Sequence, residues 1–200
     1  MATLDEITVK EEKIEAKLKE IFEIMGVKET DSNIGTAHRV AKMWVREIFR
    51  NDTSDKFKEE LDSCIKTFNP VSHRNQMIVT TVPFHAFCEH HLLPFSGKAQ
   101  IGYVPSTKII GLSKIPRIVD YLCHEPQLQE KLCSDIVDLM KEYLNPTFVC
   151  VRLIAEHSCV ACRGIEKDCE TDTFDYSSNF VVGSNLEQKY VDEFFRRVNR

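Results

Sequence analysis

The side chains best suited to chemistry lie in two short clusters of the chain. In the first, Cys88-Glu89-His90-His91, a cysteine and a histidine are three residues apart, which is the spacing of two metal ligands on one turn. The second is Glu156-His157-Ser158-Cys159, with Cys162 and Arg163 shortly after it. Thiolate sulfur and imidazole nitrogen are the donors that zinc prefers in proteins. The two clusters therefore predict a zinc site.

Two kinds of zinc site fit these residues. In a closed structural site, which would make the protein a binding module, the metal would have four ligands: Cys88, His91, Cys159 and Cys162. In a catalytic site, three of these would bind zinc and the open position would take a water whose pKa the metal lowers toward about 7, which makes a hydrolase. His90 and His157, close to ligands in both clusters, favour the catalytic interpretation, because a structural site needs no extra titrating imidazoles.

A third feature is a group of polar residues at the start of a predicted helix. Ser113, Lys114 and Arg117 fall on its first turn, with Lys114 and Arg117 on the same face. Two cations at a helix N-terminus are typical of an anion site, although each residue alone also fits ordinary solvated surface. The formal net charge of -5 means that a bound anion needs such a local cluster. Further positive charge could come from Arg163, Arg39 and Lys42.

The composition narrows the class of protein. With 42% apolar and 28% charged residues, a chain of 200 residues can bury a sizeable core. The sequence contains no run of about 20 apolar residues, and its acidic net charge gives no reason to bind nucleic acid or a membrane. The start MATLDEITVK does not resemble a signal peptide, so we expect a cytoplasmic protein whose eight cysteines are reduced.

The periodicity of apolar residues predicts the elements that position these side chains. Helical spacing predicts helices over 14–25, ending at Gly26, over 36–48 with Thr36 as N-cap, and over 57–65. β-branched and aromatic residues predict strands near 77–87, 98–104, 147–156 and 178–183. Helical spacing returns over 113–122, 128–143 and 191–198. We therefore expect a chain of class α+β that begins with an all-helical part.

Five blocks of sequence, in this order and spacing, closely resemble GTP cyclohydrolase I. They are CEHH at 88–91, GKAQIGYVP at 97–105, GLSKIPRIVDYL at 111–122, QLQEKL at 127–132 and EHSCVACRGI at 156–165. The resemblance runs from about Thr36 to Thr173. It implies the tunnelling fold, an antiparallel sheet with an inserted helix pair, with an N-terminal helical region over 1–72 and a catalytic domain over 73–200. It also implies a homodecamer of two stacked pentamers.

The resemblance further implies a reaction and a role for each site residue. Water activated by zinc would add to C8 of the guanine of GTP, and the products would be formate and 7,8-dihydroneopterin triphosphate. The zinc ligands would be Cys88, His91 and Cys159, and the proton-transfer residues His90 and His157. The guanine would be bound by Glu130 with Gln129, and the triphosphate by Ser113, Lys114, Arg117, Arg163, Arg39 and Lys42. The alternative is a zinc-stabilised binding protein of the same fold without turnover.

Overall fold

The computed structural model describes residues 4–50, 55–69 and 76–200, and it divides into two compact units. These units are Met1–Phe57 and Lys58–Arg200. The predicted boundary between positions 72 and 73 lies outside the described residues, so the predicted domain division stays a prediction. None of the described helices combines the length and hydropathy that crossing a bilayer requires.

The first unit is helical, as its apolar periodicity predicts. Its elements are α1 (Leu4–Ile24), α2 (Thr36–Met43) and the π-helical turn η1 (Trp44–Ile48). Leu18 and Ala41 form the centre of a small core between α1 and α2. Gly26 has a left-handed φ of 70°, as expected for a residue that ends a helix. The N-cap of α2, however, is Gly35 and not Thr36, which is the first residue of that helix.

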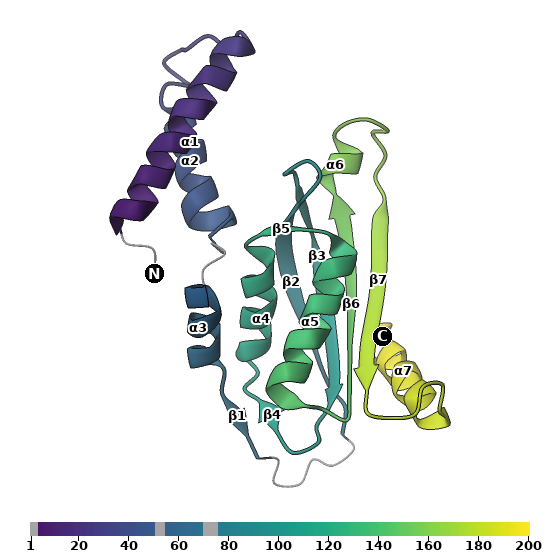
Figure 1. The fold of residues 1–200 in the computed structure, drawn as a ribbon. Coiled ribbons are helices and arrows are strands. Elements are labelled where there is room, and N and C mark those ends of the chain that lie inside the picture. The colour runs from purple at the N-terminus through teal and green to yellow at the C-terminus, as the bar shows by residue number, and fades with distance from the viewer. Residues whose placement is uncertain (1–3, 51–54, 70–75) are drawn as a thin grey trace. The chain divides into compact units, whose positions relative to one another are not determined.

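The second unit is built on a five-stranded sheet with the order β5-β2-β3-β6-β7 (Figure 1). The four long strands are antiparallel: β2 (Ile78–Cys88), β3 (Pro94–Val104), β6 (Phe148–His157) and β7 (Glu170–Ser178). β5 (Pro126–Gln127) is short and pairs in parallel with the end of β2. A separate two-stranded sheet joins β1 (Thr67–Phe68) to β4 (Ile109–Ile110).

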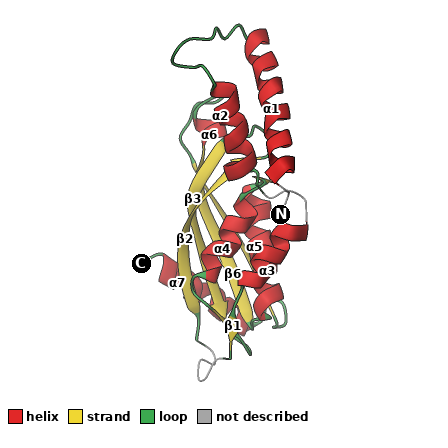
Figure 2. Ribbon diagram, turned by 90° about the vertical axis from the view of Figure 1, so that its left-hand side faces the viewer, coloured by secondary structure: helices red, strands yellow, loops and turns green. Residues whose placement is uncertain are grey.

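Helices cover both faces of this sheet (Figure 2). α4 (Lys114–Cys123) and α5 (Gln129–Leu144) pack on one face, where alternate residues of β2, such as Val82, Phe84 and Ala86, are buried. α3 (Asp55–Cys64) is joined to α5 by Lys58, whose Nζ donates to the hydroxyl of Tyr143 at 2.9 Å. Because apolar stripes of α4 and α5 meet this face, the main core lies between the helix pair and the sheet.

α7 (Asn185–Val198) covers part of the opposite face. The ring of its fully buried Phe194 rests on Gly102 of β3, where a Cβ atom would lie 2.7 Å from Cδ2 of that ring. At Gly97, also on β3, a Cβ atom would lie only 1.8 Å from the backbone oxygen of Ile154. The two glycines therefore permit the close approach of α7 and of β6, respectively.

The sequence predicted most elements but misplaced the last strand. The predicted strand over 178–183 is wrong: β7 ends at Ser178, and Val181 and Val182 lie exposed in the loop before α7. The observed β7 is a partly buried outer strand in which aromatic residues stand among polar ones. It therefore lacks the apolar run that is expected of a buried strand. The four-residue helix α6 (Ser158–Ala161) was not predicted either.

Candidate active site

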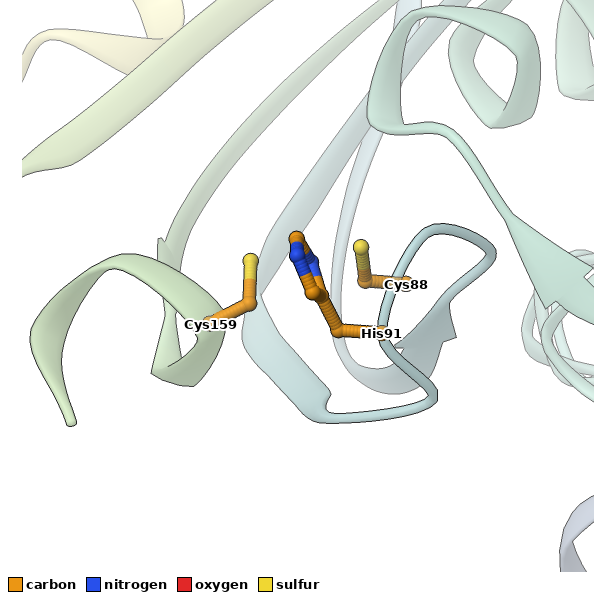
Figure 3. A group of neighbouring side chains, drawn as sticks. All are labelled: Cys88, His91 and Cys159. Carbon is orange, nitrogen blue, oxygen red and sulfur yellow. The ribbon is translucent and has the colours of Figure 1, made fainter. Parts of the chain in front are cut away.

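Three potential metal ligands converge where β2 and β6 end (Figure 3). Cys88 is the last residue of β2, and the turn after it is closed by hydrogen bonds from Cys88 N–H to Leu93 O and from Leu92 N–H to Cys88 O. Leu92 has a left-handed φ of 51°, so the chain reverses at once and brings His91 beside Cys88. β6 runs directly into α6, which supplies Cys159. We call Cys88, His91 and Cys159 the donor triad.

The donor triad fits a zinc ion. One ligand atom from each residue lies within 4.8 Å of the other two. In a tetrahedral site with metal–sulfur bonds of about 2.3 Å, two sulfurs would be about 3.8 Å apart. The ligand atoms of the triad would therefore have to approach one another only slightly to bind the ion. Burial and the neighbouring Cys88 thiol raise the pKa of Cys159, an effect that a divalent cation would oppose. Among the described residues the metal-binding group does not include Cys162, which is exposed.

His157 lies at the end of β6, two residues before Cys159, and its ring is held from two sides. It stacks on Phe95, its partner across the β3–β6 ladder, with ring centroids 4.6 Å apart and planes 4° apart. Its Nε2 lies 2.7 Å from Oε1 of Gln129, the first residue of α5. Burial lowers the pKa of His157 below its ordinary value, and the nearby Glu130 carboxylate partly opposes this effect. Burial therefore favours the neutral form of the imidazole.

The second predicted acid–base histidine lies on the metal-binding turn. His90 is exposed, and its Nδ1 is 3.8 Å from Sγ of Cys88. Its ring centroid is 6.2 Å from that of His91. Both His90 and His157 are thus close to the donor triad, and Glu130 is exposed on the first turn of α5.

The predicted phosphate-binding residues do not all lie close to the donor triad. Arg163 follows α6 and is close enough to the donor triad to lower the pKa of Cys159. Ser113, Lys114 and Arg117 are at the N-terminal end of α4 beside β4, which is the opposite end of the sheet from α6 (Figure 1). α4 alone spans about 15 Å. Ser113 is the N-cap of α4, but its hydroxyl makes no capping hydrogen bond.

The two remaining predicted cations belong to the first unit. Arg39 lies on the first turns of α2, where its guanidinium donates to Ile34 O at 3.0 Å and to Thr36 Oγ1 at 2.8 Å. Lys42 lies exposed in the last turn of the same helix. Their role toward a ligand of the second unit stays a prediction.

The sequence analysis missed three residues that support His157. Phe95 carries the ring on which His157 stacks, and Thr171 and Thr173 of β7 accept hydrogen bonds from the Gln129 amide. Phe95 follows the metal-binding turn directly, but an apolar residue there gave no chemical signal. The threonines were missed because β7 was placed too late in the chain.

Comparison with known proteins places the chain in a family. The family model for GTP cyclohydrolase I matches residues 14–196. A GTP cyclohydrolase 1 of Caldanaerobacter subterraneus subsp. tengcongensis is 40% identical over 161 residues, which are 80% of this chain and 82% of that protein. A GTP cyclohydrolase 1 of Hydrogenobaculum sp. is 37% identical over 195 residues, 96% of this chain and 100% of that protein.

A third relative matches this chain over part of a longer protein. The bifunctional protein FolKE of Lactococcus lactis subsp. lactis is 41% identical over 194 residues, which are 92% of this chain and 54% of that protein. Matches of this extent, together with the convergence of the donor triad and His157, identify the chain as a member of the GTP cyclohydrolase I family of enzymes.

Proposed function

We propose that this enzyme binds zinc and converts GTP and water to 7,8-dihydroneopterin triphosphate and formate. The observation that carries the proposal is the convergence of the donor triad, His90, His157 and Glu130 at one end of the sheet. Zinc would be bound by the donor triad, and as a Lewis acid it would generate a nucleophile from water at neutral pH. The exposed side of the triad, at His91, leaves room for substrate.

The two histidines would move protons in different steps. Burial favours the neutral form of His157, which would accept a proton from the attacking water and return one to the purine nitrogen as the ring opens. His90 is more exposed and would serve the later steps at the ribose. His157 is the last residue of β6, and His90 lies on the short turn that follows β2, so neither depends on a long loop for its position.

Guanine would be recognised at the start of α5. The Glu130 carboxylate is exposed there, with Gln129 beside it, and can accept hydrogen bonds from both N1–H and the 2-amino group of guanine. Adenine has a lone pair at N1 and no 2-amino group, so the same carboxylate would repel it. Base selectivity would follow from this one side chain.

The triphosphate would be bound between two copies of the chain. Arg163 is near the donor triad, but Ser113, Lys114 and Arg117 are at the far end of the same sheet. A neighbouring copy could bring its α4 to the triad. The sheet has edges for such an assembly, because β7 is an outer strand and β2 pairs with β5 only at Phe87 and Cys88.

The assembly we propose is the tunnelling fold, in which sheets of neighbouring copies join into rings, with two pentamers stacked into a homodecamer. Arg39 and Lys42 would add cations from the helical region. The division into a helical region over 1–72 and a catalytic domain over 73–200 belongs to the same proposal. So does a cytoplasmic location, which suits a chain with eight free thiols.

The test is turnover of GTP by the purified protein loaded with zinc. Formate is measured directly, and neopterin is measured by fluorescence after oxidation and dephosphorylation. His157→Ala should reduce turnover at least about 10²-fold. His85→Ala is the matched control, because His85 is an exposed histidine of β2 that lies outside the proposed site. Wild-type protein that binds zinc without releasing formate would establish the binding-protein alternative.

A further inference from the structure

The side-chain amide of Gln129 is almost fully enclosed, and hydrogen bonds surround it. Gln129 is only 2% exposed although it stands at the start of a helix. Its Nε2 donates to the backbone oxygens of Leu153 at 3.1 Å and Thr171 at 2.9 Å, and it lies 3.2 Å from Thr173 Oγ1. Its Oε1 is 2.7 Å from His157 Nε2.

These partners fix which way the amide points. Backbone oxygens only accept hydrogen bonds, so the nitrogen of the Gln129 amide must face Leu153 and Thr171. The reversed amide would place Oε1 against two carbonyl oxygens in a buried site, where repulsion and lost hydrogen bonds are both costly. The oxygen of the amide must therefore face His157.

The direction of the amide also fixes the tautomer of His157. An amide oxygen can only accept, so the hydrogen between the two side chains must be on His157 Nε2. A neutral imidazole carries one N–H, which leaves the lone pair on Nδ1. Stacking on Phe95, which is 1% exposed, fixes the plane of the ring at the same time.

We propose that Gln129 is a positioning residue, which holds His157 as the Nε2–H tautomer and makes Nδ1 the atom that exchanges protons with water and substrate. The proposal deepens the function proposed above and rests on it for the role of His157. It gives Gln129 an indirect role in place of direct contact with the guanine, since both polar atoms of its amide already have partners. Glu130, the next residue, is exposed and remains available to the substrate.

The tautomer can be measured in the zinc-loaded protein without any turnover. Histidine labelled with ¹⁵N is studied by solid-state NMR at about pH 8, where an imidazole with an unperturbed or lowered pKa is neutral. The signal of His157 is assigned by its loss in His157→Ala. We expect a protonated Nε2 and a bare Nδ1. A protonated Nδ1 with a bare Nε2 would overturn the proposal, whether or not the protein acts on GTP.

Kinetics separates positioning from substrate binding. Gln129→Met removes both ends of the amide, and we expect kcat to fall about 10-fold to 10²-fold while KM for GTP stays within about 3-fold. Gln129→Glu can replace the amide only as the protonated acid, which burial against the backbone oxygens of Leu153 and Thr171 favours. Its O–H then donates to one of these oxygens and its other oxygen faces His157, so this variant should retain more kcat than Gln129→Met. A merely structural role predicts no such rescue, and a direct contact with guanine predicts a rise in KM. Either of these results would refute positioning.

Two further variants complete the test. Gln100→Met is the matched control, because Gln100 is a buried glutamine of β3 outside the proposed site, and its kcat should be close to wild type. If Gln129 acts through His157, the double variant Gln129→Met/His157→Ala should be no slower than His157→Ala alone. Full turnover in His157→Ala would refute the catalytic role of that histidine, while the NMR result on the tautomer would stand separately.

Discussion

The substitution Gly97→Ala should disrupt the sheet beside the active site. A Cβ atom at this position would lie 1.8 Å from the backbone oxygen of Ile154 and 2.7 Å from Cα of Ala155. Real Cβ atoms essentially never approach a heavy atom within 3.0 Å, so β3 and β6 would have to separate locally by at least about 1.2 Å. Backbone atoms cannot rotate away as a flexible side chain can, so the strand itself must move.

The expected cost follows from the hydrogen bonds of the ladder. A separation of about 1.2 Å stretches an N···O distance of about 2.9 Å beyond 4 Å, which breaks the bond. Losing two or three such bonds costs about 1 kcal/mol each, and the buried groups left without partners add about 1–3 kcal/mol each. We therefore expect a loss of at least about 4 kcal/mol from the free energy of unfolding, a large part of the total for a typical domain.

Urea unfolding of the variant measures this loss, and Gly102→Ala is the comparison. At Gly102 the added atom would meet mainly the ring of Phe194, at 2.7 Å, and α7 can shift to relieve the contact. Overpacking of this kind costs about 1–3 kcal/mol. Gly97→Ala should also displace Phe95 and His157, which face each other two residue pairs along the ladder. A Gly97→Ala protein as stable as Gly102→Ala would refute the reasoning.

Four further predictions concern zinc binding, recognition of the guanine base, stability at acidic pH and the assembly of the chains. Alanine at any residue of the donor triad should abolish the one zinc per chain found by metal analysis, whereas Cys162→Ala should keep it. Glu130→Gln should reduce turnover of GTP at least about 10²-fold with zinc unchanged, and wild-type protein should not turn over ATP; equal rates on the two nucleotides would contradict this. Hydrogen bonds from Ser178 Oγ and the Gly183 N–H lower the pKa of Glu187 below its ordinary 4.5. This carboxylate therefore stabilises the fold above pH 4.5, and the stabilisation is lost as the pH falls through the lowered pKa. Urea unfolding at several pH values should show that the free energy of unfolding falls less at acidic pH in Glu187→Gln than in the wild type. Light scattering should give a mass near ten chains. Mixing inactive Arg117→Ala chains with inactive Cys159→Ala chains should restore part of the activity, because some sites then combine an intact Arg117 from one chain with an intact Cys159 from another. No restoration after the chains have exchanged would contradict a site shared between copies.

Local signals predicted the elements that carry strong periodicity. The apolar stripes of α4 and α5 have helical spacing, and the β-branched residues of β2 and β6 indicate buried strands. β7 was misplaced because residues with exposed apolar side chains, Val181 and Val182, outweighed the polar alternation of the real strand. Hydropathy reports whether a residue favours burial, whereas the position of an outer strand depends on pairing with the neighbouring strand.

The site shows the same division between local and long-range information. Cys88 and His91 are neighbours on one turn, so their spacing alone predicted a pair of ligands. The hydrogen bond from His157 to Gln129 joins β6 to α5, and it depends on an amide that a backbone oxygen of β7 holds in place. No spacing in the sequence reports such a contact, because it exists only after three elements have packed together.

The donor triad also has a consequence for the chain as a polymer. A metal ion bound by His91 and Cys159 would cross-link two positions about 70 residues apart, and both α4 and α5 lie in the loop that it closes. A permanent cross-link over a loop of this length removes chain entropy worth about 4 kcal/mol from the unfolded state. The ion would therefore be a reversible cross-link that stabilises one end of the sheet. Chelation should loosen the ends of β2 and β6 first, and amide hydrogen exchange should rise there before it rises beneath α4 and α5.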